Sequence, residues 1–258
     1  MGNVSFRDRL AAAVEEKGAP LCVGIDPDPA LMPAGAGLRA WCRGIVDAVA
    51  PHAAVVKPQT AFFEAHGADG WAALQDVCAY ARDAGLLVLV DAKRGDVPST
   101  MKAYATALAP LGDAVTVNPY LGEDSLEPFL ARDGLGLFAI VKTSNPGSAD
   151  LQDVPLADGR PFWHHVAERV DRWDIEAVVG ATHPDVLADA RALMPRAVLL
   201  LPGVGAQGGR IEDLAPAFAA GPASALPTAS RSVIYAGDPG AAAAALVDQL
   251  RSTTLSLG

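Results

Sequence analysis

Eight short apolar runs, each followed by a stretch with helical character, constrain the fold of this chain more than any other feature of its sequence. A short apolar run bounded by turn signals is typical of a strand buried on both faces. The runs expected to form strands are 21–25, 53–56, 86–90, 114–117, 137–141, 177–179, 197–201 and 232–235. The expected helices are 5–17, 41–50, 71–84, 102–111, 123–132, 162–172, 184–193, 211–220 and 239–252. Strict alternation of strands and helices predicts a parallel sheet, and eight such units close into a (β/α)8 TIM barrel.

The length of the chain suits a barrel of this kind. Its 258 residues, of which 51% are hydrophobic, are enough for one large domain with a substantial core. No internal repeat or low-complexity linker divides the sequence. We therefore predict an α/β protein with a single TIM-barrel domain over residues 1–258.

Charge and cysteine content bear on the partners and the compartment. The formal net charge of −10 argues against nucleic acid or an anionic membrane as the main partner. No apolar run approaches the ~18 residues of a membrane span, and the N-terminus lacks the basic end and apolar core of a signal peptide. Cys22, Cys42 and Cys78 have no metal-type spacing, so we expect reduced, buried thiols in the cytoplasm.

Charged side chains gather where the third apolar run ends. Asp91 and Lys93 are two residues apart, so on a strand they share a face, and Asp96 follows on a short turn before the next helix. Burying such groups costs several kcal/mol per ion unless each is paired. The alternative is a solvated turn with a chance ion pair, which is common and contributes little.

Polar residues also follow other predicted strands, and this favours a functional charged cluster at 91–96 over a solvated turn with a chance ion pair. They are Asp26, Lys57, Ser144 and Gln207. In a parallel barrel all strand ends meet at one mouth, where active sites lie. Lys57, Asp91, Lys93 and Asp96 then form an alternating array that keeps Lys93 charged and able to deliver a proton. Asp26 is placed to accept from a ligand hydroxyl, unless it only forms a turn before proline.

The glycine-rich loop 202–209, PGVGAQGG, predicts a phosphate site. Glycine lets backbone amides approach an anion closely, and the loops after strands seven and eight commonly bind phosphate in this architecture. Arg231, next to Ser230, supplies the side chain best shaped to hold a phosphate. The alternative is a flexible connector with one surface arginine.

Motifs for metal or triad chemistry are absent from the sequence. It has no H-x-x-x-H, no clustered Cys/His pattern and no G-x-S-x-G elbow. We therefore predict no metal, although Asp26, Asp91 and Asp96 could in principle hold Mg²⁺.

Residues 91–100, DAKRGDVPST, resemble the D-x-K-x-x-D signature of the orotidine 5′-phosphate decarboxylase family, in the form of its bacterial D-A-K-R-G-D subgroup, type 2. The resemblance continues at 23–27 (VGIDP), 56–59 (VKPQ), 143–147 (TSNPG), 202–209 and 230–232 (SRS). It covers nearly the whole chain in order. Two positions depart from it: Pro98, where small residues are more usual, and Gly205, where some relatives carry arginine, so phosphate binding would rest on Gln207 and Arg231.

The resemblance implies cofactor-free decarboxylation of orotidine 5′-phosphate to uridine 5′-phosphate and CO₂, the last step of de novo pyrimidine synthesis. The catalytic residues that it implies are Lys93 as proton donor, Asp91, Asp96 and Lys57. The substrate-binding residues that it implies are Asp26, Thr100, Ser144, Pro202, Gly203, Gln207, Ser230 and Arg231, with Thr143 as the alternative to Ser144. It also implies a homodimer in which Asp96 reaches the neighbouring subunit's site.

Two other functions remain open at this point. One is a related barrel enzyme that uses Mg²⁺, a hexulose-phosphate synthase or a ketogulonate-phosphate decarboxylase, which shares the D-x-K-x-x-D strand. The sequences at 57–59 and 143–147 argue against it. The other is a catalytically silent barrel that only binds nucleotides, which the presence of all four charged residues disfavours.

Overall fold

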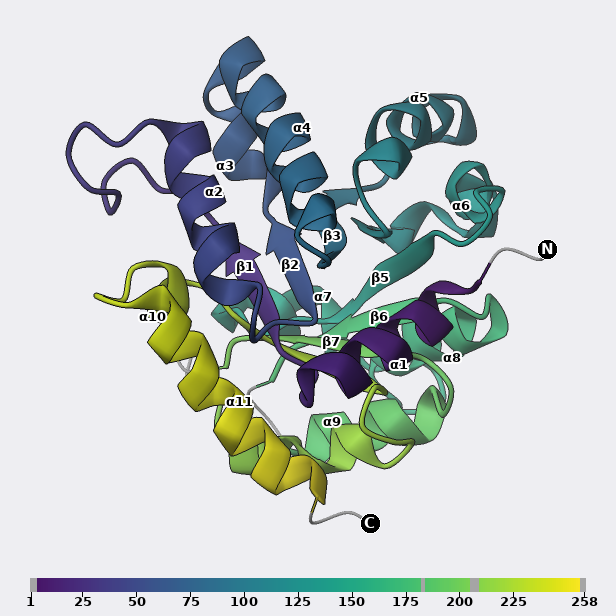
Figure 1. The fold of residues 1–258 in the computed structure, drawn as a ribbon. Helices are drawn as coiled ribbons and strands as arrows, with labels where there is room; N and C mark the ends of the chain where they lie inside the picture. The colour runs from purple at the N-terminus through teal and green to yellow at the C-terminus, as the bar shows by residue number, and fades with distance from the viewer. Residues whose placement is uncertain (1–3, 182–183, 205–208, 256–258) are drawn as a thin grey trace.

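The chain folds into a closed barrel of eight parallel strands surrounded by helices (Figure 1). The structure, a computed structural model, describes residues 4–181, 184–204 and 209–255. The strands are β1 Cys22–Ile25, β2 Val55–Pro58, β3 Leu87–Arg94, β4 Ala114–Val117, β5 Gly136–Lys142, β6 Glu176–Val179, β7 Leu199–Pro202 and β8 Ala225–Ala229. They pair in sequence order, and β8 returns to β1 through the pair Cys22 and Thr228. The predicted TIM barrel is confirmed.

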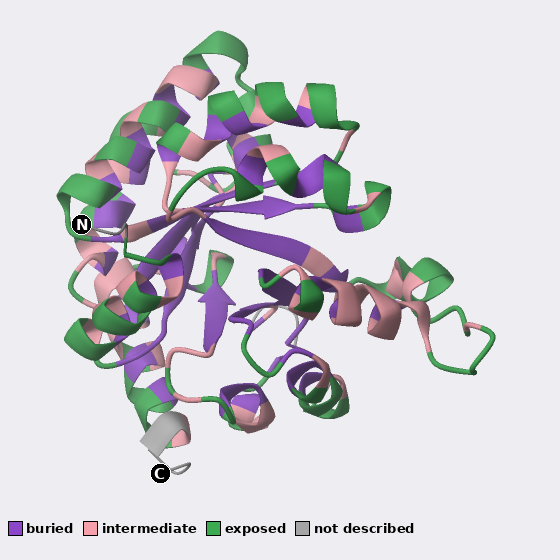
Figure 2. Ribbon diagram, turned by 90° about the vertical axis from the view of Figure 1, so that its right-hand side faces the viewer, coloured by how far each residue is buried: buried purple, intermediate pink, exposed green. Residues whose placement is uncertain are grey.

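Helices cover the outside of the barrel. The α-helices are α1 Phe6–Lys17, α2 Leu38–Val49, α3 Thr60–Glu64, α4 Gly67–Asp83, α5 Pro98–Leu108, α6 Glu123–Leu130, α7 Ala149–Gln152, α8 Phe162–Arg172, α9 Pro184–Leu193, α10 Arg231–Ile234 and α11 Pro239–Leu255. Short 3₁₀ helices are η1 Ala109–Leu111, η2 Pro119–Leu121, η3 Pro146–Ser148 and η4 Ile211–Phe218. Figure 2 shows the helices exposed outward and buried toward the strands, as amphipathic helices around a barrel require.

The prediction of the eighth strand was wrong. The β-branched sequence 232–235 lies in the one-turn helix α10 and its end, and β8 is the segment ALPTA before it. The segment was not predicted as a strand because it contains Pro227 and small residues. Proline lacks the N–H that a strand ladder needs and is depleted in strands. As a result Ser230 and Arg231 follow the last strand, at the mouth, instead of preceding it.

The expected α-helix at 211–220 also differs from the structure. Residues 211–218 form the 3₁₀ helix η4, which contains Pro216. A proline inside a helix removes one backbone hydrogen bond and crowds the preceding turn, which disfavours a regular α-helix here.

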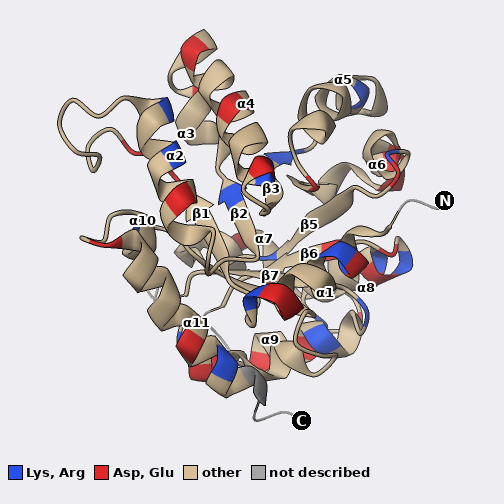
Figure 3. Cartoon of the chain, viewed as in Figure 1, with Lys and Arg blue, Asp and Glu red and all other residues tan. Residues whose placement is uncertain are grey.

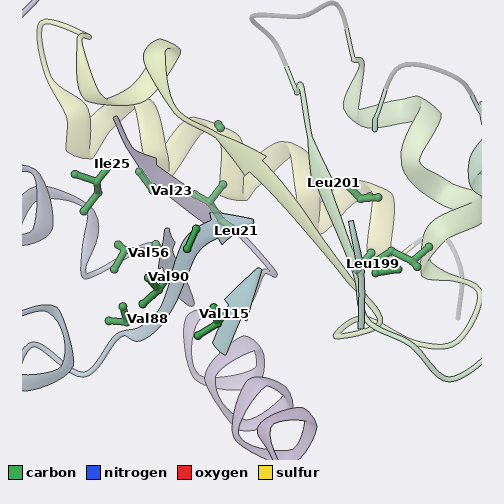
Figure 4. Packing of buried hydrophobic residues seen from close by; sticks show 14 of the residues in the cluster. Leu21, Val23, Ile25, Val56, Val88, Val90, Val115, Leu199 and Leu201 are labelled. Atoms are coloured by element: carbon green, nitrogen blue, oxygen red, sulfur yellow. The ribbon is translucent and has the colours of Figure 1, made fainter. Parts of the chain in front are cut away.

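The strands divide the core into two apolar clusters. Side chains such as Val23, Val56 and Val88 belong to the larger cluster, in which strands pack against helices (Figure 4). Alternate residues such as Val55 and Leu89 belong to the smaller cluster, in the interior of the barrel. This division follows from the two-residue period of a strand.

The interior becomes polar toward the carboxyl ends of the strands. Two residues beyond the apolar Val55 and Leu89, the same period places Lys57 and Asp91. Lys57, Asp91 and Thr116 are buried although they are polar. Because parallel strands run in one direction, these side chains lie at the same end of the barrel.

Helix α1 closes the opposite, amino end. Phe6, Leu10 and Val14 join the interior cluster, and the Phe6 ring meets that of Phe138 edge-on at 5.6 Å between centroids. Arg7 Nε donates to Glu176 Oε1 at 2.7 Å, and Arg9 forms an ion pair with Asp113. The carboxyl end of the barrel therefore carries the candidate site.

The three cysteines are buried and unpaired, as predicted. Within the described residues, no helix is both long enough and apolar enough to cross a membrane.

Candidate active site

The carboxylate of Asp91, on β3, is the centre of the site. Its Oδ1 accepts hydrogen bonds from Lys93 Nζ at 2.5 Å and Thr116 Oγ1 at 2.8 Å. Its Oδ2 accepts from Lys57 Nζ at 2.7 Å and Gln59 Nε2 at 3.1 Å. Asp91 is only 3% exposed. Four donors from three strand ends thus fix one buried carboxylate.

Electrostatics keep this group ionised. Burial alone would raise the pKa of Asp91, but the ammonium groups of Lys57 and Lys93 outweigh it and hold the pKa well below its ordinary value. Burial likewise would lower the pKa of Lys57, but Asp91 and Asp26 raise it above the ordinary value. A buried ion without its partner would cost several kcal/mol, so the three groups depend on one another. Figure 3 shows basic segments, in blue, on β2 and at the end of β3.

Lys93 has an unusual backbone. Its φ is +47°, in the left-handed region that costs a non-glycine residue about 1–3 kcal/mol. The pairing of β3 with β4 shifts register between Val90 and Arg94. The sequence correctly predicts that Lys93 meets Asp91, but an irregular backbone rather than regular strand alternation brings them together. The Lys93 side chain is 39% exposed, so it lies at the mouth while its amine contacts the buried carboxylate.

Asp96 lies apart from this cluster. Its Oδ1 accepts from the backbone N–H of Val97 at 2.7 Å, on the turn before α5. Within the described chain no ion pair joins Asp96 to Lys93. Thr100 is the third residue of α5, which begins four residues before the predicted start at 102.

Asp26 faces the ends of β1 and β8. Ser230 Oγ donates to Asp26 Oδ2 at 2.5 Å, and Tyr235 Oη donates to the Asp26 carbonyl at 2.8 Å. Asp26 Oδ1 is buried and has no hydrogen-bond partner in the described structure. Gly24 allows this approach, because a Cβ there would lie 2.8 Å from Ser230 Cβ. Asp26 Oδ1 can therefore accept one more hydrogen bond.

The predicted phosphate site is described in part. Pro202 ends β7, and Gly203 has a φ of +107°, which favours glycine. Arg231 begins α10 with an exposed side chain that has no ion pair with the described residues. The predicted phosphate-binding residue Gln207, with the rest of 205–208, lies outside the described residues.

The loop after β5 carries Thr143 and Ser144. Thr143 Oγ1 donates to Asn145 Oδ1 at 2.6 Å and accepts from Gln152 Nε2 at 2.9 Å. The Thr143 hydroxyl thus holds the loop together. Ser144 packs against Gly180, where a Cβ would lie 2.8 Å from the serine Cβ.

Two residues of the cluster were not singled out for a role from the sequence. Gln59 continues the inward face of β2 two residues beyond Lys57, and Thr116 does the same on β4 beyond Ala114. The two-residue period at the strand ends was the signal that could have identified them.

The described residues contain no group of three or more His, Cys, Asp or Glu side chains placed to hold a metal ion. Asp26, Asp91 and Asp96 do not come together as such a group in the described structure.

Residues 19–246 match the orotidine 5′-phosphate decarboxylase / HUMPS family. The chain belongs to this family. A relative named orotidine 5′-phosphate decarboxylase from Roseiflexus castenholzii is 48% identical over 246 residues, covering 90% of each chain. Another of that name, from Halorubrum lacusprofundi, is 45% identical over 249 residues, covering 91% of this chain and 89% of the relative.

A solved structure confirms the family's barrel. Leishmania donovani OMP decarboxylase superposes with a TM-score of 0.87 at 36% identity, over 98% of this chain and 100% of that one. The family resemblance inferred from the sequence motifs is thus confirmed, and the Asp91 cluster lies within the matched residues. The relatives' names are those of carboxy-lyases, so the chain is a member of an enzyme family.

Proposed function

We propose that this chain decarboxylates orotidine 5′-phosphate to uridine 5′-phosphate and CO₂ in pyrimidine biosynthesis, without a metal or an organic cofactor. The observation that carries the proposal is the Lys57–Asp91–Lys93 array, in which two ammonium groups hold the buried Asp91 carboxylate at the mouth of the barrel. The relatives at 45–48% identity bear the name of this activity.

The chemistry needs a cation where negative charge develops. When the bond between C6 of the pyrimidine and the carboxylate breaks, its electron pair stays on C6 and CO₂ leaves. The Lys93 ammonium stabilises that charge and transfers a proton to C6, which leaves a neutral amine for water to reprotonate. Asp91 keeps the ammonium in place before the reaction, at 2.5 Å.

Asp91 has a second role in this proposal. Its ionised carboxylate faces the carboxylate of the substrate, and the repulsion between them disappears as CO₂ departs. Interactions that favour the transition state over the bound substrate raise the rate of the chemical step. The low pKa of Asp91 keeps this repulsion in force at neutral pH.

The other side chains hold the nucleotide. Asp26, through its unpartnered Oδ1, and Thr100 bind ribose hydroxyls. Ser144 binds the pyrimidine, with Thr143 as the alternative. Pro202, Gly203, Gln207, Ser230 and Arg231 surround the phosphate. Phosphate contacts distant from C6 supply binding energy that positions the ring.

The proposed assembly is a homodimer in which Asp96 completes the neighbouring subunit's array. Val97, next to Asp96, is 50% exposed, and Tyr120 is 75% exposed. A cavity of about 940 Å³ with mainly apolar walls, including Tyr120, Leu151 and Val154, lies beside the loop after β5. Exposed apolar surface of this kind is typical of an interface. Gly95 packs against Asn118, which lines this cavity, so the surface reaches the turn that carries Asp96, and this favours a second copy as its occupant. Three buried thiols suit a reducing compartment, and we propose the cytoplasm.

The test is turnover without metal. Protein treated with EDTA and desalted is mixed with orotidine 5′-phosphate while the substrate's absorbance is followed, and the product is identified by chromatography. We expect full conversion to uridine 5′-phosphate at the same rate with and without EDTA.

Two results would contradict the proposal. Activity that returns only with Mg²⁺ would favour the related sugar-phosphate enzymes. No change in absorbance, together with tight binding of uridine 5′-phosphate, would favour a barrel that only binds nucleotides.

A further inference from the structure

We infer that Thr116 is a positioning residue of the decarboxylation site. Its hydroxyl holds both the Asp91 carboxylate and the backbone of Lys93 in place. The inference rests on the proposed function and adds a residue that the charged motif does not contain. Thr116 lies on β4, in the interior of the barrel, and is fully buried.

Its hydroxyl joins the two catalytic residues in one chain of hydrogen bonds. Oγ1 donates to Asp91 Oδ1 at 2.8 Å and accepts from the backbone N–H of Lys93 at 2.9 Å. A hydroxyl has one proton to donate and lone pairs to accept, so both bonds form at once. A methyl group in its place would satisfy neither.

The hydrogen bond from Thr116 to Asp91 matters when Lys93 transfers its proton. Asp91 Oδ1 has two donors, the Lys93 ammonium and the Thr116 hydroxyl. As the ammonium turns toward C6 and gives up its proton, it withdraws from Oδ1. Thr116 then remains as the neutral donor to that oxygen, so the buried carboxylate keeps its orientation and its charge. Without it, moving the ammonium would leave Oδ1 without a donor, which is unfavourable for a buried anion.

The hydrogen bond from the Lys93 N–H to Thr116 stabilises a strained backbone. Lys93 holds a left-handed backbone, with φ of +47°, where β3 loses its regular pairing with β4. Such a conformation persists only where its surroundings hold it. The Lys93 N–H donates to the Thr116 side chain within the stretch where the regular pairing of β3 with β4 is lost. This bond holds the backbone that places the lysine side chain at the mouth.

The experiment compares three variants with the wild type. Thr116→Val keeps the shape and removes the hydroxyl, and Thr116→Ser keeps the hydroxyl. Thr228→Val, on β8, makes the same change at a buried threonine whose hydroxyl contacts the Leu226 carbonyl and the Cys22 thiol, but neither Asp91 nor Lys93. We measure kcat and KM for orotidine 5′-phosphate, and hydrogen exchange of the Lys93 amide by NMR.

We expect Thr116→Val to lower kcat about 10- to 100-fold while KM changes less than about threefold, because the lost bonds position the reacting groups more than they bind substrate. The Lys93 amide should exchange at least about tenfold faster, since it loses its acceptor. Thr116→Ser and Thr228→Val should stay within about threefold of wild type in kcat. If the valine variant does not fold, Thr116→Ala is measured instead, with the same expected loss.

The outcomes separate this inference from the proposed function. A wild type that leaves orotidine 5′-phosphate unchanged refutes the function, and with it any role of Thr116 in that reaction. An active wild type with an equally active Thr116→Val, or with an unchanged Lys93 amide, refutes only the inference. Equal losses of kcat in Thr116→Val, Thr116→Ser and Thr228→Val would show general damage to the barrel and also refute it.

Discussion

At the scale of residues, the site depends on one buried anion and on what surrounds it. Asp91 accepts from two ammonium groups, an amide and a hydroxyl, and is only 3% exposed. The charged groups were predictable because buried ions at strand ends need partners. Gln59 and Thr116 were not assigned a role, since amides and hydroxyls are common near strand ends and their partners are visible only in the fold.

The irregular backbone at Lys93 likewise could not be predicted from the sequence. A lysine gives no sign of a left-handed φ, which glycine or asparagine would have suggested. Asp96 marks a different limit. Its place in the motif predicts a role in the array, but within the described chain it bonds only to the next residue's N–H. The role of Asp96 in a neighbouring subunit's site, which the resemblance implies, stays a prediction.

Arg231 gives a prediction at this scale. Arg231→Ala should raise KM for orotidine 5′-phosphate about 10- to 100-fold, because a hydrogen bond to a charged group contributes about 1.5–3 kcal/mol. The inhibition constant of orotidine, which lacks the phosphate, should change less than about twofold. Steady-state kinetics with both compounds provide the measurement. Equal weakening of both would remove Arg231 from the phosphate site.

At the scale of elements, apolar patterning identified seven of the eight strands and missed the last. The sequence at 114–117 matched β4 residue for residue because a β-branched run is unambiguous there. In β8, alanines and Pro227 replace such a run, and closure of the barrel by pairing with β7 and β1 forms the strand. Tertiary pairing thus overrides local preference where the local signal is weak.

Strand β6 carries a buried acid that makes stability depend on pH. Burial raises the pKa of Glu176 above its ordinary value, although the Arg7 guanidinium opposes this. The folded protein therefore binds this proton more tightly than the unfolded chain does. This contribution to the free energy of unfolding is full below the unfolded pKa of about 4.3 and is lost as pH rises through the folded value.

We predict that wild type gains stability relative to Glu176→Gln as pH falls from neutral toward about 4. The glutamine cannot titrate, so its own curve lacks this dependence. Urea unfolding of both proteins across that range measures the difference. A constant difference, or one that moves in favour of the variant at low pH, would contradict the prediction. Arg172→Gln, at the end of α8, serves as a control whose difference from wild type should stay flat.

At the scale of the whole molecule, the amino end of the barrel contributes to stability and the carboxyl end carries the candidate site. Helix α1 closes the amino end with Phe6, Leu10 and the arginine pairs, and this end supports stability. The carboxyl end holds the polar cluster and the exposed apolar surface around Tyr120. Strand direction made this polarity predictable, whereas the homodimer, which only the family resemblance implies, stays a prediction.

The proposed dimer can be tested by mixing inactive variants. Lys93→Ala and Asp96→Asn should each be nearly inactive alone. If Asp96 acts in the neighbouring site, subunit exchange produces hybrids in which one of the two sites has both wild-type residues. An equal mixture should then recover about one quarter of wild-type activity, since about half of the dimers are hybrids. No recovery, despite hybrids detected by native mass spectrometry, would place Asp96 in its own subunit's site.

The most direct test of the account is the turnover number of Lys93→Ala on orotidine 5′-phosphate, with circular dichroism and thermal unfolding to show that the barrel is intact. Loss of both the cation and the proton at C6 should lower kcat by at least about 10³-fold. A folded variant that retained a substantial fraction of wild-type kcat would show that another group protonates C6 and would contradict the central claim.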